Sequence, residues 1–460
     1  MNLQLGFIID AVGGQLLSGN AAAVNRVETD SRTVHPGSLF VALHGERYDG
    51  HDFVMKAIES GAAAVLVSRK VEISSAIGAA VILVDDTLIA LQQLAAQYRR
   101  TFSLPVIAVT GSVGKTTTKD ILADCLGSHY NTLKTQANFN NEIGLPMSLL
   151  NLRPFHQAAV FEIGMRTPGD IRYLAQLMEP NCAIITNVEP VHLETMGSLE
   201  NIARAKCEVF EFIKNDGFVL LNGDNRLLLE EAEHYPCQKY FFGCMDHCDI
   251  KINSLVNDGA GIKVRIQMFD RGEEEFYLPV PVSQMAYNLA AAVGMAYLMG
   301  VDNEEIKSAL KSFHPGGNRM NVINLAGGGV LIDDSYNANP ISVVAALEAC
   351  REISRGRRTV AVLGDMLELG AYEQEGHLKA GQRAAEVGID LLVTIGSLAQ
   401  YYREGALAAG MKKDNTHHFD SREEALAWLR DHVSDADVIL VKASRGMQLD
   451  ILARDLFAEN

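Results

Sequence analysis

One segment of the chain constrains the fold more than any other, because it combines a buried strand, a glycine-rich turn and the start of a helix. The apolar run Val106-Ile107-Ala108-Val109 leads into Thr110-Gly111-Ser112-Val113-Gly114-Lys115-Thr116-Thr117. Gly111 and Gly114 let successive backbone N–H groups converge on a phosphate. Lys115 adds a positive charge, and the Thr116 hydroxyl is placed to hold Mg²⁺. We therefore expect an ATP-binding loop formed by Gly111, Ser112, Val113, Gly114, Lys115, Thr116 and Thr117.

The loop is a variant of the common phosphate-binding motif. The usual pattern, G-x-x-x-x-G-K-[ST], requires glycine at the position of Val109. This chain has T-G-S-x-G-K-T instead. An incidental glycine-rich turn is the alternative interpretation, but the strand, the glycines, the lysine and the threonine all occur in the required order. The variant therefore limits the number of nucleotide-binding families to which the chain can belong.

Length and composition exclude several classes of protein. A chain of 460 residues predicts two or three domains. The formal net charge of -17 argues against a nucleic-acid partner, which would require a basic face. The N-terminus lacks a basic region, and no apolar stretch approaches the roughly twenty residues that span a bilayer. We expect a cytoplasmic protein without a membrane span.

The seven cysteines fit reduced thiols in a reducing compartment. Cys237, Cys244, His247 and Cys248 lie close together in the sequence and suggest a zinc knuckle as an alternative. Their spacing matches none of the paired-cysteine zinc patterns, so we favour buried thiols.

Hydrophobic patterns divide the chain into three segments. Residues 1–85 mix short apolar runs with turns, as in a small α/β domain, and residues 87–100 have helical spacing. Strand-like and helical patterns then alternate to Phe313, which predicts a parallel sheet with helices on both faces. The segment His314-Pro315-Gly316-Gly317-Asn318 marks a turn or hinge. After it the alternation resumes, and several strands end in polar residues. We predict an α/β protein with three domains over residues 1–85, 86–313 and 314–460: a small recognition domain, a central P-loop parallel-sheet ATPase domain and a C-terminal Rossmann-like domain.

Three residues of the central segment are candidates for metal binding and catalysis. Glu162 directly follows the apolar run 158–161, so its carboxylate would lie at the carboxyl edge of a strand. Enzymes with a phosphate-binding loop need an acidic residue at this edge to help hold Mg²⁺. His192 is either a metal ligand or a solvated loop histidine. Lys206 lies in a helical pattern, where a lysine is ordinarily a salt-bridging surface residue.

The C-terminal segment has a polar cluster after its first strand, Asp333-Asp334-Ser335-Tyr336-Asn337-Ala338-Asn339-Pro340. Asp334 is suited to accept hydrogen bonds from a ribose, and Tyr336 to stack on a base. Helix capping by Asn337 or Asn339, with Pro340 opening the helix, is compatible with these roles.

Together these segments resemble the Mur ligases of peptidoglycan synthesis over nearly the whole chain. The resemblance rests on Thr29-Asp30-Ser31-Arg32, the 110–116 loop, Asn138-Phe139-Asn140-Asn141-Glu142, Glu162-Ile163-Gly164-Met165, His192-Leu193-Glu194, Ala205-Lys206-Cys207-Glu208, Asn288, Arg319, the 334–340 cluster and Gly364-Asp365-Met366-Leu367-Glu368-Leu369-Gly370. The C-terminal motifs are most similar to those of the members that add a dipeptide. The Asp-Asn-Pro-Arg motif of the diaminopimelate-adding members is absent from the sequence.

The resemblance implies an ATP-dependent amide ligase. ATP would phosphorylate the terminal carboxylate of a UDP-N-acetylmuramoyl-tripeptide, and the amine of D-Ala-D-Ala would attack the acyl phosphate. Such chemistry needs positioning and charge neutralisation. By resemblance, Lys115 contacts the terminal phosphates, Thr116 and Glu162 bind one Mg²⁺, and His192 serves a second. Lys206 matches a position that is carbamylated in related ligases and would help to hold the second metal.

Further residues receive roles only from the resemblance. The residues that contact ATP would be Asn288, Arg319, Asp334 and Tyr336. The uridine diphosphate would be bound by Ser31, Arg32 and His51, and the sugar or peptide by Asn140 and Asn141. Further contacts with substrate would come from Lys442, Ser444 and Arg445. We expect a monomer. The alternatives are another member of the superfamily, such as the preceding Mur ligase or a folylpolyglutamate synthase, a P-loop switch or motor, and a catalytically inactive binding protein.

Overall fold

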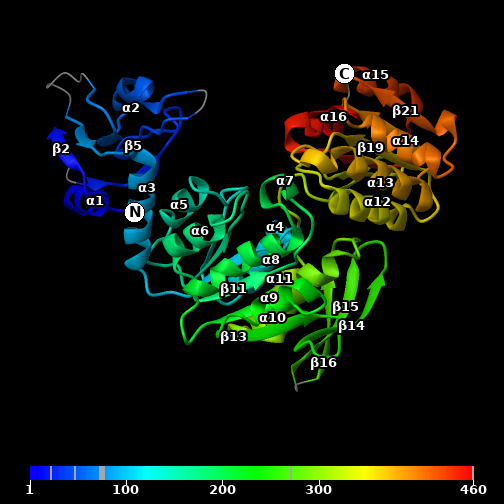
Figure 1. The fold of residues 1–460 in the computed structure, drawn as a ribbon, viewed down its shortest axis with the longest axis horizontal. Helices are drawn as coiled ribbons and strands as arrows, with labels where there is room; N and C mark the ends of the chain where they lie inside the picture. Colours follow the sequence, from blue (N-terminus) through cyan, green and yellow to red (C-terminus); the bar gives the residue numbers. More distant parts are fainter. Residues whose placement is uncertain (21–22, 46–47, 72–77, 270–271, 458–460) are drawn as a thin grey trace.

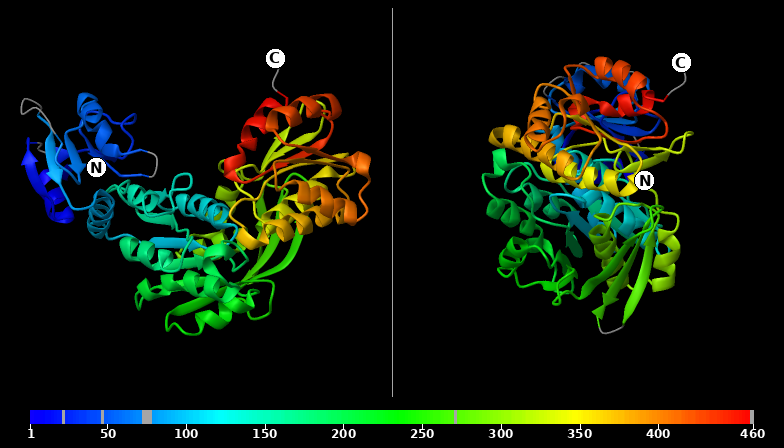
Figure 2. Two further views of the ribbon diagram at one scale, coloured as in Figure 1. Left: turned by 45° about the horizontal axis from the view of Figure 1, so that its top comes forward. Right: turned by 90° about the vertical axis from the view of Figure 1, so that its right-hand side faces the viewer.

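The structure, a computed structural model, describes residues 1–20, 23–45, 48–71, 78–269 and 272–457. Within these residues the strands form sheets of five, nine and six strands and a two-stranded ribbon of β1 (Leu3–Gln4) and β3 (Ala23–Val24). The three large sheets lie in three lobes. The N-terminal and C-terminal lobes stand on the same side of the central lobe, so the molecule is V-shaped (Figures 1 and 2).

The N-terminal lobe is a small α/β layer structure. Its sheet has the order β2 (Gln15–Ser18), β7 (Ala80–Leu83), β6 (Ala64–Val67), β5 (Ser38–Val41) and β4 (Arg26–Glu28). All neighbours are parallel except β2 and β7. Helices α1 (Leu5–Val12) and α3 (Thr87–Arg100) pack on one face and α2 (Val54–Glu59) on the other.

Helix α3 links the N-terminal lobe to the central lobe. The predicted helix at residues 87–100 is confirmed with the same bounds, and the side chain of Asp86 caps it by accepting from the amides of Leu88 and Ile89. The buried residues of α3 belong to one apolar cluster with α1 and with α5 (Gly144–Leu149) and α6 (Asp170–Met178) of the central lobe. A continuous core therefore fixes the two lobes against each other.

The central sheet has the order β16 (Glu273–Leu278), β15 (Ile262–Met268), β14 (Ile250–Asn257), β13 (Gln238–Gly243), β12 (Phe218–Asn222), β11 (Cys182–Ile185), β8 (Val106–Thr110), β10 (Ala158–Glu162) and β9 (Thr132–Lys134). From β14 to β9 in this order, which includes β8, all neighbouring strands are parallel, as predicted. The expectation of a wholly parallel sheet is wrong at one edge, because β14, β15 and β16 form an antiparallel meander. Their alternation of exposed and buried residues leaves one face open to water.

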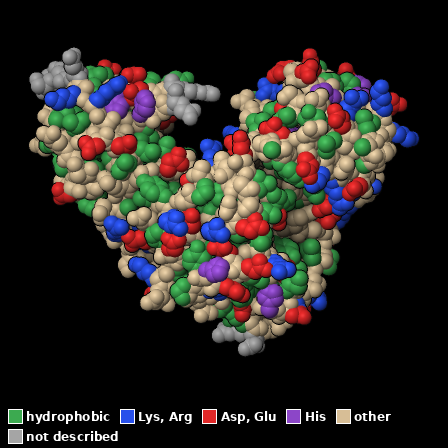
Figure 3. All heavy atoms as spheres, in the orientation of Figure 1, with side chains coloured by type: hydrophobic (Ala, Val, Ile, Leu, Met, Phe, Trp, Pro, Cys, Tyr) green, Lys and Arg blue, Asp and Glu red, His purple; other side chains and the backbone are tan. Residues whose placement is uncertain are grey.

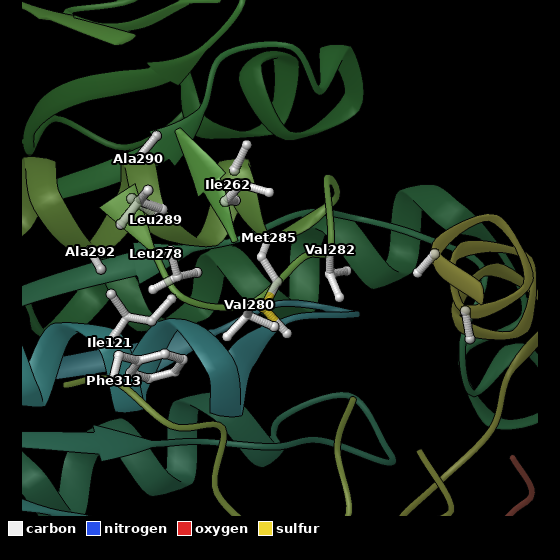
Figure 4. Packing of buried hydrophobic residues seen from close by; sticks show 14 of the residues in the cluster. Ile121, Ile262, Leu278, Val280, Val282, Met285, Leu289, Ala290, Ala292 and Phe313 are labelled. Carbon is white, nitrogen blue, oxygen red and sulfur yellow. The ribbon is translucent and has the colours of Figure 1, made fainter. Parts of the chain in front are cut away.

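Strand β8 lies in the middle of this sheet and is buried on both faces. Ile107 and Val109 belong to one core cluster, whereas Val106 and Ala108 belong to another. The first cluster holds α4 (Lys115–Gly127) and α10 (Met285–Leu298) against the sheet. Figure 4 shows Met285 and Leu289 of α10 beside Leu278 and Ile262, with Ile121 of α4 below them. The continuous apolar run is thus explained by helices on both sides.

The C-terminal lobe is a doubly wound sheet, as predicted. Its order is β17 (Asn321–Asn324), β18 (Val330–Asp333), β22 (Val438–Lys442), β19 (Thr359–Gly364), β20 (Leu391–Ile395) and β21 (Thr416–Phe419), with only the β17–β18 pair antiparallel. Helices α12 (Pro340–Ser354), α13 (Glu373–Glu386) and α14 (Gln400–Ala408) cover one face, and α15 (Arg422–His432) and α16 (Leu449–Asp455) cover the other. Asn339 caps α12 and Pro340 opens it, which confirms the capping interpretation.

The surface is hollowed between the N-terminal and C-terminal lobes, and acidic and basic side chains are mixed over the face shown in Figure 3. No helix in the described part of the chain is long and apolar enough to cross a membrane.

All seven cysteines are free. Five of them are buried, but Cys237 is half-buried and Cys244 is exposed, so the expectation of buried thiols fails at these two positions.

Candidate active site at the carboxyl edge of the central sheet

The predicted phosphate-binding loop joins β8 to α4, and its two glycines are required by the backbone. Gly111 has φ +146° and Gly114 has φ +84°. A Cβ at Gly111 would clash with the side chain of Thr186, and one at Gly114 would clash with the amide of Asn288. The loop therefore passes so close to its neighbours that only glycine fits at these positions.

Two residues that follow β11 hold the loop in shape. The side-chain oxygen of Asn187 accepts hydrogen bonds from the amides of Ser112 (3.2 Å) and Val113 (2.9 Å). The hydroxyl of Thr186 donates to the carbonyl of Val113 at 2.6 Å. The amides of Ser112 and Val113 thus bind Asn187, and their predicted contact with a nucleotide stays a prediction. Sequence reasoning missed this role, although Thr186 and Asn187 are polar residues at the end of a buried strand.

Lys115 begins α4 and is half-buried. Its ammonium group donates to the carbonyls of Gly111 (2.8 Å) and Ser112 (3.2 Å). Burial lowers the pKa of Lys115, Glu162 opposes this shift and the Arg319 guanidinium adds to it. The charges of Lys115 and Arg319 thus interact, and a shared role of the two residues in nucleotide binding stays a prediction.

Thr116 and Glu162 meet at the carboxyl ends of β8 and β10. The Thr116 hydroxyl donates to Oε2 of Glu162 at 2.7 Å, and Nδ2 of Asn140 donates to Oε1 at 2.7 Å. Both Thr116 and Glu162 are buried. Thr135 braces the same strand end, because its hydroxyl accepts from the amide of Glu162 at 3.0 Å. Asn140, predicted to contact the sugar or peptide, therefore contacts the Glu162 carboxylate.

The oxygen ligands at this point suit a hard divalent cation. Within the described residues, no three His, Cys, Asp or Glu side chains are grouped so that they could hold a metal alone. Mg²⁺ needs fewer, because it is commonly held by one or two protein oxygens together with phosphate oxygens and water. The hydroxyl of Thr116 and the carboxylate of Glu162 fit that pattern.

His192 and Lys206 lie near the loop. His192 has φ +55° and precedes the short helix α7 (Leu193–Met196). Burial lowers the pKa of His192, and the charges of Lys115, Lys206 and Arg166 add to the effect while Glu368 opposes it. The neutral imidazole that this favours is the form that binds metals.

Lys206 is buried in α8 (Leu199–Cys207), with 1% of its surface exposed. The alternative of a solvated, ion-paired lysine is therefore wrong: among the described residues no carboxylate oxygen lies within 4.0 Å of its ammonium nitrogen. Burial and the neighbouring Lys115 charge move the pKa of Lys206 well below its ordinary value. A lysine that is buried without a counter-charge and close to a second cation is unusual outside a functional site.

Asn288 extends the site onto α10. Its side-chain amide donates to the hydroxyl of Thr118 (3.0 Å) and to the carbonyl of Gly114 (3.3 Å). The structure therefore places Asn288 against the loop and the first turn of α4.

The C-terminal lobe contributes an arginine and tyrosine cluster next to the hinge. The guanidinium of Arg319 lies 3.9 Å from the centre of the Tyr336 ring, and that of Arg445 lies 5.6 Å from it. The Tyr336 amide donates to the carbonyl of Asn318 at 3.0 Å. Arg319 covers one face of the Tyr336 ring, so stacking of a base on that face would require the arginine to move.

Asp334, Lys442 and Ser444 are buried polar residues with hydrogen-bond partners inside the protein. Lys442 Nζ pairs with Oδ2 of Asp334 at 2.5 Å, and Oδ1 of Asp334 accepts from the amide of Met320 at 3.0 Å. The Ser444 hydroxyl accepts from the amide of Leu367 at 2.9 Å. All three side chains thus have partners within the protein, and their expected contacts with ribose and substrate stay predictions. Arg445, which is exposed, is the member of the 442–445 segment that is free to meet a ligand.

The three residues predicted to face uridine diphosphate lie in the N-terminal lobe, away from the loop. Ser31 is buried. Arg32 is exposed and pairs with Asp30, whose pKa falls to about 2 because of that hydrogen bond. His51 is buried, its Nδ1 lies 2.6 Å from Asp49, and its Nε2 accepts from the Ser68 amide at 2.9 Å. Both ring nitrogens are occupied, so His51 shapes this region and offers no free nitrogen to a ligand.

Asn141 also has a local role. Its side-chain oxygen accepts from the amide of Gly144 at 2.9 Å, at the beginning of α5. The alternative of a zinc knuckle at residues 237–248 finds no metal-binding group among the described residues. Cys244 instead lies 3.3 Å from the Tyr287 hydroxyl, which donates to Asp224 at 2.7 Å.

Comparison with known proteins agrees with this geometry. Three families match successive parts of the chain: "Mur ligase family, catalytic domain" at residues 23–99, "Mur ligase middle domain" at 109–296, and "Mur ligase, glutamate ligase domain" at 318–445. A UDP-N-acetylmuramoyl-tripeptide–D-alanyl-D-alanine ligase of Bacillus subtilis (strain 168) is 38% identical over 433 residues, which cover 94% of this chain and 93% of the relative.

Solved structures give the same result. A crystal structure of MurF from Acinetobacter baumannii superimposes with a TM-score of 0.89 at 31% identity and covers 99% of both chains. That of the MurF ligase from Thermotoga maritima in complex with ADP has a TM-score of 0.81 at 30% identity, covering 94% of this chain and 98% of the other. The 111–117 loop, the Thr116–Glu162 pair and these full-length similarities lead to one conclusion: the chain belongs to the Mur ligase family.

Proposed function

We propose that this protein is an ATP-dependent ligase that joins D-Ala-D-Ala to UDP-N-acetylmuramoyl-tripeptide and forms ADP and phosphate. The observation that carries the proposal is the buried contact of Thr116 with Glu162 beside the Lys115 loop. The names of the relatives, which cover nearly the whole chain, supply the two substrates.

The residues at the loop are suited to phosphoryl transfer. The Thr116 hydroxyl and the Glu162 carboxylate would hold Mg²⁺, which when bound neutralises charge on the terminal phosphates. Lys115 and Arg319 add positive charge at the same place. Asn288 supports the loop from α10 and would contact the nucleotide.

The proposed reaction has two steps. A carboxylate oxygen of the tripeptide attacks the γ-phosphorus of ATP, the bond to the bridging oxygen breaks, and ADP leaves. The dipeptide amine then attacks the acyl carbon, its nitrogen loses a proton, and inorganic phosphate leaves from the tetrahedral intermediate. The cationic side chains stabilise the charge that develops on the phosphoryl oxygens, and closure of the C-terminal lobe excludes water from the acyl phosphate.

Lys206 would act as a carbamate together with His192. A lowered pKa favours the neutral amine, whose nitrogen would attack the carbon of carbon dioxide and lose a proton. The product is an anion, which the neighbouring Lys115 charge would stabilise and which would supply oxygen ligands for a second Mg²⁺ together with His192. This modification explains how a buried lysine near Lys115 is tolerated.

The lobes would divide the work. We assign residues 1–85 to recognition of the UDP-linked substrate, residues 86–313 to ATP binding, and residues 314–460 to the second substrate and to closure over ATP. Arg445 is the candidate contact for the carboxylate of the dipeptide, because it is exposed beside Tyr336. We expect a cytoplasmic monomer.

Phosphate release from ATP, measured with each acceptor omitted in turn, tests the proposal. A ligase requires both UDP-N-acetylmuramoyl-tripeptide and D-Ala-D-Ala for sustained release. A P-loop switch or motor would release phosphate without either compound, and an inactive binding protein would release none with both; either result contradicts the proposal.

A further inference from the structure

One loop of the C-terminal lobe contacts the central lobe next to His192. Residues 365–370 follow β19, and Gly370 lies so close to α7 that a Cβ there would meet the side chain of Glu194 at 2.9 Å. Figure 1 shows α7 at the top of the central lobe, beside the C-terminal lobe. His192 immediately precedes α7, so the loop meets the central lobe at the candidate metal ligand.

The loop is held firmly within its own lobe. The Asp365 carboxylate accepts from the amides of Leu398 (3.0 Å) and Ala399 (2.7 Å). The amide of Met366 donates to the buried His377 at 2.9 Å, and that of Leu367 donates to Ser444. Glu368 is therefore attached to a rigid support and moves with the C-terminal lobe.

Glu368 has an unusual backbone conformation. Its φ is +64°, a left-handed value that costs a non-glycine residue roughly 1–2 kcal/mol. Its carboxylate extends across the lobe boundary: Oε2 lies 3.8 Å from Nδ1 of His192, and Oε1 lies 3.8 Å from the guanidinium of Arg166. Within the described residues, no other carboxylate lies within ion-pair distance of His192.

These contacts contribute little to lobe docking as such. Glu368 is 61% exposed and Arg166 is 78% exposed, and exposed ion pairs typically contribute only about 0–1 kcal/mol. Stability alone does not explain a strained residue at this point, whereas its direction toward His192 does.

We propose that Glu368 is a positioning residue that orients His192 for metal binding and so couples the placement of the C-terminal lobe to the second metal site. The inference rests on the proposed function. When a carboxylate faces Nδ1, the proton resides there and Nε2 keeps its lone pair free for a metal. A distance of 3.8 Å is an ion-pair contact, and an approach of about 1 Å would make it a hydrogen bond.

The geometry makes this contact conditional on lobe closure. His192 belongs to the central lobe and Glu368 to the C-terminal lobe, so the carboxylate reaches the imidazole only when the two lobes are together. The enzyme would then complete its second metal site only with the lobe that closes over ATP in place, which would limit wasteful ATP hydrolysis.

Mn²⁺ titration followed by electron paramagnetic resonance tests the inference on the full-length protein with AMPPNP. We expect Glu368→Gln to weaken one bound Mn²⁺ by about tenfold, since loss of a partner of a metal-bound histidine typically costs 10–100-fold in affinity. His192→Ala should weaken the same Mn²⁺. The matched control is Glu352→Gln, which alters another lobe contact: Glu352 accepts from Asn257 (3.1 Å) and Ser283 (2.8 Å), and its replacement should leave both Mn²⁺ affinities unchanged.

Product formation by the wild-type protein is measured in parallel. If the wild type makes product while Glu368→Gln binds Mn²⁺ as the wild type does, within twofold, the inference is wrong and the proposed function stands. An equal loss in Glu352→Gln also overturns it, because lobe docking in general would then be the cause. If the wild type makes no product, the proposed function fails and the inference with it.

Discussion

The hydroxyl of Thr116 donates a 2.7 Å hydrogen bond to Oε2 of Glu162 and so joins the first turn of α4 to the end of β10. This contact brings together a hydroxyl and a carboxylate from segments that are 46 residues apart. We predict that Mg²⁺ and the triphosphate of ATP bind at this contact.

Removal of the Thr116 hydroxyl should abolish catalysis without unfolding the protein. Thr116→Val keeps the shape of the side chain but removes the oxygen, and we expect a fall in kcat of about 100-fold. Thr116→Ser keeps the oxygen and should retain most activity. Steady-state kinetics over a range of Mg²⁺ concentrations measure both variants; equal loss in the two would point to packing as the cause.

Replacement of Lys115 should separate chemistry from substrate recognition. We expect Lys115→Ala to lower kcat at least about 100-fold, because it removes a charge that stabilises the transferred phosphoryl group. Calorimetry should show UDP-N-acetylmuramoyl-tripeptide binding close to that of the wild type, since this substrate is assigned to the N-terminal lobe. Loss of that binding would contradict the proposed division of roles.

Lys206→Ala should be inactive but recoverable. If Lys206 acts as a carbamate, a small carboxylate such as formate or acetate can occupy the space and restore part of the activity. Lys119→Ala is the matched control, because Lys119 is also buried, yet it donates to the Thr135 carbonyl (3.0 Å) and pairs with Asp120. Carboxylates should not restore activity lost in that variant. Full activity of Lys206→Ala without any addition would refute the carbamate.

Lys442 should matter for stability more than for substrate binding. Lys442→Met leaves the buried carboxylate of Asp334 without its partner, which typically costs about 3–5 kcal/mol. Urea unfolding should show this loss, and the double variant Lys442→Met with Asp334→Asn should recover part of it. Lys379→Met, which breaks an exposed pair with Glu375, should change stability by less than about 0.5 kcal/mol. If Lys442→Met unfolds at the same urea concentration as the wild type, the buried Lys442–Asp334 pair does not stabilise the protein and the expectation is wrong.

Much of the fold could be predicted because it depends on local patterns. The run 106–109 is apolar at every position, which indicates a strand covered on both faces, and the spacing in residues 87–100 gave the bounds of α3. The meander β14 to β16 was missed because its strands alternate with polar residues and carry no motif. Its antiparallel pairing depends on contacts between strands, which the sequence pattern alone does not specify.

The site could be predicted only in part, for a similar reason. Thr116, Glu162 and Lys115 stand at strand ends or in the loop, so their placement follows from topology. The partners that occupy His51, Lys442 and Ser444 are distant in sequence, and a residue type does not reveal whether its polar atoms are already satisfied. The same applies to Asn187, whose hydrogen bonds to the loop span 74 and 75 residues.

The transfer of oxygen from substrate to phosphate tests the central claim most directly. The UDP-N-acetylmuramoyl-tripeptide is labelled with ¹⁸O in its terminal carboxylate and incubated with ATP, Mg²⁺ and D-Ala-D-Ala, and the inorganic phosphate is analysed by mass spectrometry. An acyl phosphate predicts one ¹⁸O atom in each phosphate released, together with ADP. Unlabelled phosphate, or label in AMP with release of pyrophosphate, would contradict activation of the carboxylate by the terminal phosphoryl group of ATP.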